Sequence, residues 1–126
     1  MESIPGTFII KVDYQPVSVV KDGNEDKTHA CLGPDPAVFT LVDGHLESGD
    51  WILGRSLVED RSLLPKRVLW FNKQSTRTDM VHKVLAFPDG DSYRLEFLGA
   101  PLISHEGKLF ADLMKDQPQD VQIIIQ

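Results

Sequence analysis

The chain has 126 residues, of which 41% are hydrophobic and 25% are charged, which is ordinary for one globular domain and too short for two. Its net charge of −6 argues against partners that are themselves anionic, namely nucleic acids and acidic membrane surfaces. Cys31 is the only cysteine, which excludes an internal disulfide and a multi-thiolate metal site and favours a reducing compartment. We therefore expect residues 1–126 to form a single domain.

Short segments rich in Val, Ile, Leu and Phe, several of them alternating with polar residues, predict β-strands along the whole chain. Turn signals separate most of these segments: Asp22-Gly23-Asn24, Asp43-Gly44, Pro88-Asp89-Gly90 and Glu106-Gly107. The Asp43-Gly44 pair, with apolar residues on both sides, is the strongest hairpin signal. The predicted strands are residues 7–12, 17–20, 29–32, 38–42, 51–53, 67–71, 81–87, 92–98, 108–113 and 121–125, with shorter ones near 45–47 and 101–104.

Helical signals are weak in this sequence. Residues 56–59 match a capping box, but Pro65 limits any helix there to two turns. Residues 108–115 also have some helical character, although we favour a strand over 108–113. The chain is thus expected to be all-β, with strands spaced about ten residues apart as in a sandwich or barrel.

Three segments share an aromatic residue two positions before an aliphatic one. Phe8, Phe39 and Tyr93 begin these three patterns. Twelve short strands in three related groups is the strand count of a β-trefoil, so we predict that fold. The alternative is a chance similarity among aromatic-rich strands.

One stretch, residues 53–68, differs from the rest and contains Gly54-Arg55 followed by Glu59-Asp60-Arg61-Ser62-Leu63-Leu64-Pro65-Lys66. It resembles the Gly-Arg…Glu-Asp-x-Ser-Leu-x-Pro-Lys segment of the fungal β-trefoil serine-protease inhibitors, the cospin-like family of mushrooms. Residues 93–101, 108–111 and 120–124 resemble further parts of the same family. The resemblance implies a β-trefoil that inhibits trypsin-like serine proteases, with no cofactor. It also implies a cytoplasmic defence protein.

The resemblance further implies that an exposed loop, here residues 56–66, enters the protease active site like a substrate. Arg61 suits a trypsin-like specificity pocket, which ends in a buried carboxylate, and the small Ser62 leaves the scissile carbonyl accessible. Leu63 and Leu64 fit shallow apolar subsites, and Pro65 removes conformational freedom before binding. This interpretation predicts a monomer whose partner is a trypsin-like serine protease.

The two residues before Arg61 in that loop, Glu59 and Asp60, are acidic and would favour a basic protease over an acidic one. They also allow a second interpretation, in which a local ion pair holds a turn and Arg61 lies against the barrel wall; such surface pairs contribute under about 1 kcal/mol. In a third possibility, another basic residue is the bait, meaning the residue that enters the specificity pocket of the protease. These rivals are Arg55, Lys66, Arg67 and Arg77.

Other functional classes have little support in the sequence. The histidines have no metal-ligand spacing, and no nucleophile elbow or phosphate-binding loop occurs, so we expect neither a metal, nor a cofactor, nor an enzyme. No Gln-x-Trp lectin motif occurs, and Trp51 and Trp70 are expected in or near the core. A buried, inert thiol is expected at Cys31.

Two alternative functions stay open at this point. One is a non-inhibitory carbohydrate-binding or cell-wall-associated β-trefoil module, and the other is inhibition of cysteine proteases through a different loop. The N-terminal residues contain neither the basic nor the apolar part of a secretory signal, so a cytoplasmic location is expected. The longest apolar runs, residues 68–71 and 121–125, are too short to span a bilayer.

Overall fold

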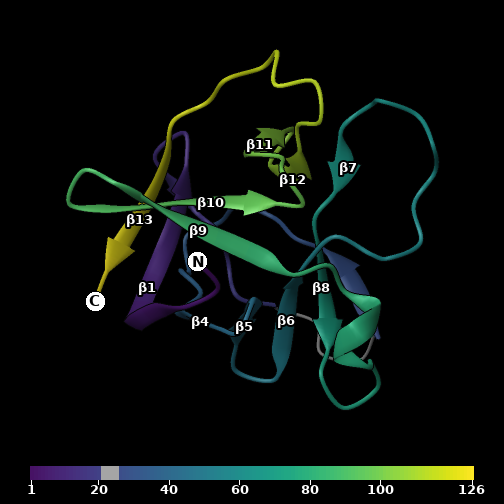
Figure 1. The fold of residues 1–126 in the computed structure, drawn as a ribbon, viewed down its shortest axis with the longest axis horizontal. Helices are drawn as coiled ribbons and strands as arrows, with labels where there is room; N and C mark the ends of the chain where they lie inside the picture. Colours follow the sequence, from purple (N-terminus) through teal and green to yellow (C-terminus); the bar gives the residue numbers. More distant parts are fainter. Residues whose placement is uncertain (21–25) are drawn as a thin grey trace.

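Apolar and polar residues alternate in several strands of this chain, so that each of these strands turns one face toward the core. In β1 (Ile4–Val12), Phe8, Ile10 and Val12 are fully buried, and in β10 (Ser92–Phe97) the buried positions are Leu95 and Phe97. The computed structural model describes residues 1–20 and 26–126, and these are all-β apart from one short 3-10 helix (Figure 1). The predicted all-β class is therefore confirmed.

The strands are short and follow one another closely along the described chain. Their bounds are β1 (Ile4–Val12), β2 (Gln15–Pro16), β3 (Lys27–His29), β4 (Phe39–Val42), β5 (His45–Ser48), β6 (Trp51–Gly54), β7 (Lys66–Arg67), β8 (Leu69–Asn72), β9 (Val84–Asp89), β10 (Ser92–Phe97), β11 (Leu102–His105), β12 (Lys108–Ala111) and β13 (Val121–Ile125), with the 3-10 helix η1 (Thr78–Met80) between β8 and β9. Among the described residues, no helix is long and apolar enough to cross a membrane.

The strands pair antiparallel in three sheets. The largest has the order β13-β1-β4-β5-β6-β8-β3, with β2 paired to β1; β9 pairs with β10, and β11-β12-β7 form the third sheet. Hydrogen bonds join these sheets at their edges. The amide of Val84 donates to the carbonyl of Gly44 at 2.9 Å, and the hydroxyl of Ser92 donates to the carbonyl of Ile123 at 2.6 Å. All three sheets contribute buried residues to the main hydrophobic core, and a smaller buried cluster contains Ile52, Leu69, Phe71 and Val81.

Aromatic rings form the centre of this core. The ring of Phe39 stacks on Trp70 with centroids 5.6 Å apart and on Phe8 with centroids 6.0 Å apart. Trp70 is only 2% exposed, and the half-buried Trp51 packs against the same cluster. The expectation that both tryptophans pack in or near the core is confirmed.

Two of the predicted tight turns have the geometry that their residues favour. Asp43 and Gly44 have φ of 53° and 82° between β4 and β5, and Glu106 and Gly107 have φ of 52° and 79° between β11 and β12. Positive φ at both central positions matches the twist of a hairpin, and glycine adopts it without strain. The turn predicted at residues 88–90 lies slightly later in the chain, because β9 continues to Asp89. The predicted turn at residues 22–24 lies outside the described residues.

Several predicted strands are shorter than expected because neighbouring residues pair with different partners and not with one continuous strand. Of the strand predicted at 17–20, only isolated bridges at Val17 and Ser18 form, directly after β2. The one predicted at 29–32 is reduced to His29 at the end of β3 and to bridges at Cys31 and Leu32. Residues 67–71 divide between β7 and β8, which pair with different sheets. Residues 56–59 are not helical, and 108–111 form β12, as favoured.

The expectation of a buried thiol at Cys31 is wrong. Ala30 is fully buried, whereas Cys31 is exposed. Successive side chains of an extended chain point to opposite faces, so burying Ala30 turns Cys31 toward solvent. The apolar run in the sequence did not indicate which of the two faces inward.

His29 is a half-buried titratable group in this fold. Its Nε2 lies 2.6 Å from the carbonyl oxygen of Leu109, and its ring meets Phe110 edge-on with centroids 4.9 Å apart. Burial lowers the pKa of His29 below its ordinary value of 6.5; the cations Lys108 and Arg67 lower it further, while the hydrogen bond to Leu109 opposes the shift.

Because the unfolded chain then takes up this proton at a higher pH than the folded one, protonation favours unfolding. The stability that depends on neutral His29 is complete above about pH 6.5 and declines as the pH falls below that value. We expect the thermal midpoint to fall between about pH 7 and pH 5, and His29→Gln to reduce that fall. The exposed His105 provides the control variant His105→Gln; an unchanged pH profile in His29→Gln would contradict this assignment.

Candidate functional site

The loop between β6 and β7, residues 55–65, leaves the sheets as a broad excursion and returns to the edge of the third sheet (Figure 1). It carries apolar side chains that face solvent: Val58 is 76% exposed, Leu63 65% and Leu64 70%. Loops with a regular scaffold beneath them commonly carry binding residues. An apolar surface of this kind on a projecting loop is typical of a contact region.

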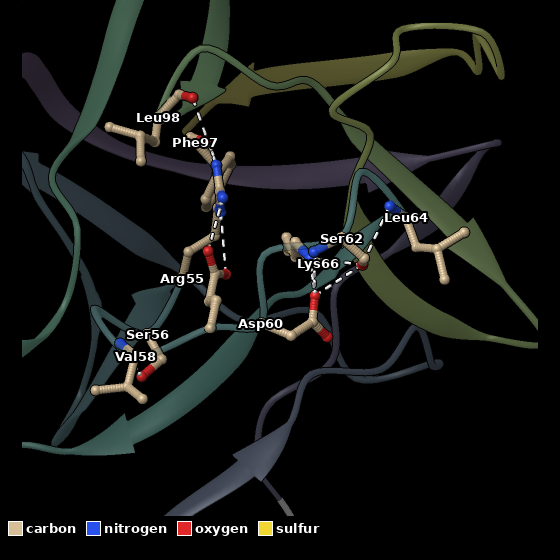
Figure 2. Close-up of polar contacts among 10 residues, drawn as sticks. Arg55, Ser56, Val58, Asp60, Ser62, Leu64, Lys66, Phe97 and Leu98 are labelled. Carbon is tan, nitrogen blue, oxygen red and sulfur yellow. Dashed lines mark hydrogen bonds and ion pairs between the residues drawn. The ribbon is translucent and has the colours of Figure 1, made fainter.

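Arg55 anchors the first half of this loop. It follows β6 directly, and its side chain is only 6% exposed. Its Nε and Nη2 donate to the two carboxylate oxygens of Glu59 at 3.1 and 2.7 Å, and its Nη1 donates to the carbonyl of Phe97 at 2.9 Å (Figure 2). A two-pronged guanidinium–carboxylate contact is among the stronger hydrogen-bonded pairs in proteins. The loop is thereby tied to the end of β10, far away in the sequence.

Lys66 anchors the second half. It begins β7, and its side chain is 6% exposed, so it lies beneath the loop. Its Nζ donates to Oδ1 of Asp60 and, at 3.0 Å, to Oγ of Ser62 (Figure 2). A buried ammonium is costly unless it is paired and hydrogen-bonded, and here both conditions are met by residues of the loop.

Asp60 and Ser62 form a turn around Arg61. Oδ1 of Asp60 accepts hydrogen bonds from the amide of Ser62 at 3.0 Å and from its hydroxyl at 2.7 Å, and the amide of Leu64 donates to Oγ of Ser62 at 3.4 Å. Aspartate commonly makes such turns by bonding to its own backbone two residues later. Hydrogen bonds from Lys66 and Ser62 lower the pKa of Asp60 from 3.8 to about 2. The carboxylate that organises the turn is therefore ionised throughout the neutral range.

Arg61 itself sits at the tip of this turn and is exposed. Within residues 1–20 and 26–126, its guanidinium has no hydrogen bond or ion pair, whereas the acidic residues beside it are engaged by Arg55 and Lys66. The structure thus brings the predicted site residues 59–65 together on one loop and leaves the Arg61 side chain available to a partner.

The rival bait residues differ from Arg61 in accessibility. Arg55 and Lys66 are buried and paired, so neither reaches a protease pocket without dismantling the loop. Arg77 is exposed, but it pairs with Asp79 at 2.7 Å on a different loop. Arg67 is exposed and lies within β7, where its backbone is paired with Phe110 of β12. The local ion pairs foreseen in the second interpretation exist, but they involve Arg55 and Lys66 rather than Arg61.

Two hollows adjoin the loop. A polar one of about 250 Å³ lies between the loop and the sheets and is lined by Glu59, Asp60 and Lys66 among others. A larger one of about 450 Å³ lies beside Leu64 and Pro65 and is mostly apolar. The second hollow extends the apolar surface of the loop toward β12.

The sequence does not reveal the anchoring roles of Arg55 and Lys66, because it indicates both only as residues that could enter a protease pocket. One signal was present: a basic residue stands at each end of the loop and an acidic pair stands between them. The fold adds what the spacing lacks, namely the burial of both cations. In the described parts of the chain, no cluster of three or more His, Cys, Asp or Glu side chains is placed to hold a metal ion.

The loop and most of the chain match a known protein family. The model of the family described as peptidase inhibitor I66 matches residues 39–126, which include the whole loop and most of the chain. Searches of the curated proteins and of the solved structures each found no significant match. The family match confirms the expected class of protease inhibitor and the prediction that the chain is not an enzyme.

The anchor at Arg55 can be tested by its effect on stability. We expect Arg55→Met to lower the free energy of unfolding by about 2 kcal/mol, because it leaves the Glu59 carboxylate and two backbone carbonyls without their donor. Arg77→Met, which removes a fully surface-exposed pair, should change it by less than about 1 kcal/mol. Urea unfolding of the three proteins measures both values; equal stabilities for Arg55→Met and Arg77→Met would contradict the anchoring role.

Proposed function

The chain belongs to the peptidase inhibitor I66 family, and from this premise we propose that it inhibits trypsin-like serine proteases by presenting residues 56–66 to the active site. The observation that carries this proposal is the state of Arg61, which is exposed and has no hydrogen bond or ion pair within residues 1–20 and 26–126, on a loop whose two ends are anchored by buried cations. The proposed complex contains one inhibitor monomer and one protease.

The chemistry of the specificity pocket favours Arg61 as the inserted residue. A trypsin-like pocket ends in a carboxylate, which a guanidinium neutralises through two parallel hydrogen bonds. A side chain already paired within its own protein would have to break that pair before entering. Among the described residues, Arg61 has no such pair to break, in contrast to Arg55 and Arg77.

The acidic residues before Arg61 are compatible with this proposal. Glu59 pairs with Arg55, and Asp60 pairs with Lys66, so each negative charge is offset within the inhibitor. In the described part of the chain, the charge on this loop that is left without a counterpart is that of Arg61. Electrostatic attraction toward an acidic pocket therefore persists despite the two preceding carboxylates.

The residues after Arg61 suit the opposite side of the scissile bond. Ser62 is small, so it leaves the Arg61 carbonyl open to the attacking serine. Leu63 and Leu64 are exposed, and Leu64 lines the apolar hollow together with Pro65. These residues provide an apolar contact surface. A standard inhibitor interface covers about 800 Å² on each partner.

Pre-organisation accounts for the affinity in this proposal. Binding costs free energy for every loop and side chain that must be ordered, and a loop that is already fixed avoids much of that cost. Here the hydrogen bonds of Arg55 and Lys66, the turn of Asp60 and the fixed φ of Pro65 order the backbone beforehand.

We also propose that the fold is a β-trefoil. Support comes from the pairing of its outer strands, which join one another in a ring: β3 pairs with β8, β7 pairs with β12, and Cys31 bridges Lys108. Each pairing links segments from different thirds of the chain, as expected where three hairpins cover one end of a barrel. In this arrangement, residues 55–65 and β7 lie between β6 and β8, which pair with each other.

The role of Arg61 predicts a specific loss of inhibition. Arg61→Ala should weaken inhibition of trypsin by about 10³-fold or more, because it removes the side chain at the centre of the interface. The exposed position of Arg61 means that the thermal midpoint should change little. Steady-state inhibition of bovine trypsin and thermal unfolding provide the two measurements.

Arg77→Ala and Arg67→Ala are the matched controls, since each removes one exposed arginine outside residues 56–66. Both should keep the inhibition constant of the unaltered protein. Full potency in Arg61→Ala together with a loss in either control would move the bait to that residue.

A further inference from the structure

This inference rests on the proposed function and concerns what happens to the loop after a protease attacks it. We propose that Lys66 is a positioning residue that spans the Arg61–Ser62 peptide bond from below and keeps its two sides together, so that the loop remains an inhibitor rather than becoming a substrate.

The contacts of Lys66 fall on both sides of that bond. Its Nζ donates to Oδ1 of Asp60, which precedes Arg61, and to Oγ of Ser62, which follows it, the latter at 3.0 Å. The backbone of Lys66 is paired with Ala111 of β12, outside the loop. Its position therefore does not depend on whether the peptide bond above it is intact.

Arg55 cannot take this role. Its side chain contacts Glu59, on the N-terminal side of the bond, and the carbonyls of Phe97 and Leu98 in the body of the protein. It fixes where the loop begins. Of the two buried cations, Lys66 alone reaches residues on both sides of Arg61.

The chemistry of attack gives this arrangement a consequence. When the serine oxygen of the protease bonds to the Arg61 carbonyl carbon, the C–N bond to Ser62 breaks and the nitrogen takes up a proton, leaving an amine. The Ser62 nitrogen already donates to Oδ1 of Asp60 at 3.0 Å, and the Ser62 hydroxyl accepts a hydrogen bond from Lys66. The amine therefore stays beside the ester carbon.

Two reactions then compete for the acyl-enzyme. If the retained amine attacks, the Arg61–Ser62 amide re-forms and the protease serine leaves with its proton restored. If water attacks instead, the products are a carboxylate at Arg61 and an ammonium at Ser62. A nucleophile kept in place has a large advantage over one that must arrive from solution, so the contacts of Lys66 favour re-formation.

The test replaces Lys66 with methionine, which keeps the length of the apolar stem and removes the ammonium. Lys73→Met is the matched control, because Lys73 also pairs with a carboxylate, Glu47, at 2.8 Å, but lies outside the loop. One measurement follows cleavage of the loop at Leu63 and Leu64 by thermolysin, which is independent of any trypsin inhibition. The other incubates each protein with catalytic amounts of trypsin and follows residual inhibition and the Arg61–Ser62 cleavage product over time.

We expect thermolysin to cut the loop of Lys66→Met about tenfold faster than that of the unaltered protein or of Lys73→Met. We also expect Lys66→Met to inhibit trypsin at first and then to lose inhibition as the cleaved form accumulates. A merely structural lysine would lower stability without separating initial from lasting inhibition.

Equal thermolysin rates and equally lasting inhibition in all three proteins would overturn the role of Lys66 while leaving the proposed function standing. Absence of trypsin inhibition in the unaltered protein would instead refute the proposed function, and the thermolysin rates alone would then decide the positioning role. If Lys66→Met fails to fold, Ser62→Ala provides a second variant, because it removes the hydrogen bond between Lys66 and the exposed Ser62 on the C-terminal side of the scissile bond. This variant must also show faster cleavage by thermolysin and a faster loss of trypsin inhibition.

Discussion

The shape of the candidate site depends on two buried cations that find their counter-charges within one loop. Arg55 and Lys66 are each 6% exposed, and neither would be stable there without Glu59 and Asp60. Glu59 is 16% exposed and Asp60 is 75% exposed, but each directs a carboxylate oxygen to its cation, while Arg61 and the leucines that follow face solvent. The requirement to pair buried charge thus determines which side of the loop a partner can contact.

The rest of the fold supplies a base to which these charges can be fixed. Arg55 donates to the carbonyl of Phe97, a fully buried residue at the end of β10, and Lys66 lies in a strand paired with β12. Buried residues of β10 and β12 belong to the same core cluster as Phe39. Loop geometry is therefore coupled to packing far away in the sequence, as a pre-organised inhibitor requires.

Much of this architecture could be predicted from the sequence, and the failures have physical causes. Period-two alternation found strands such as β10, and Asp-Gly and Glu-Gly pairs found two hairpin turns, because both signals are local. The burial of Arg55 and Lys66 was not predictable, since it depends on strands that approach from distant parts of the chain. For the same reason the sequence could not show which face Cys31 would take.

The most direct test of this account is a titration of bovine trypsin with the unaltered protein, repeated with a small cationic ligand that occupies the specificity pocket. The account predicts that activity falls to zero near equimolar inhibitor, and that the cationic ligand competes with the inhibitor, since both place a positive charge in one pocket. Trypsin that keeps its full rate in a large molar excess of the protein, or inhibition unaffected by the small ligand, would contradict it.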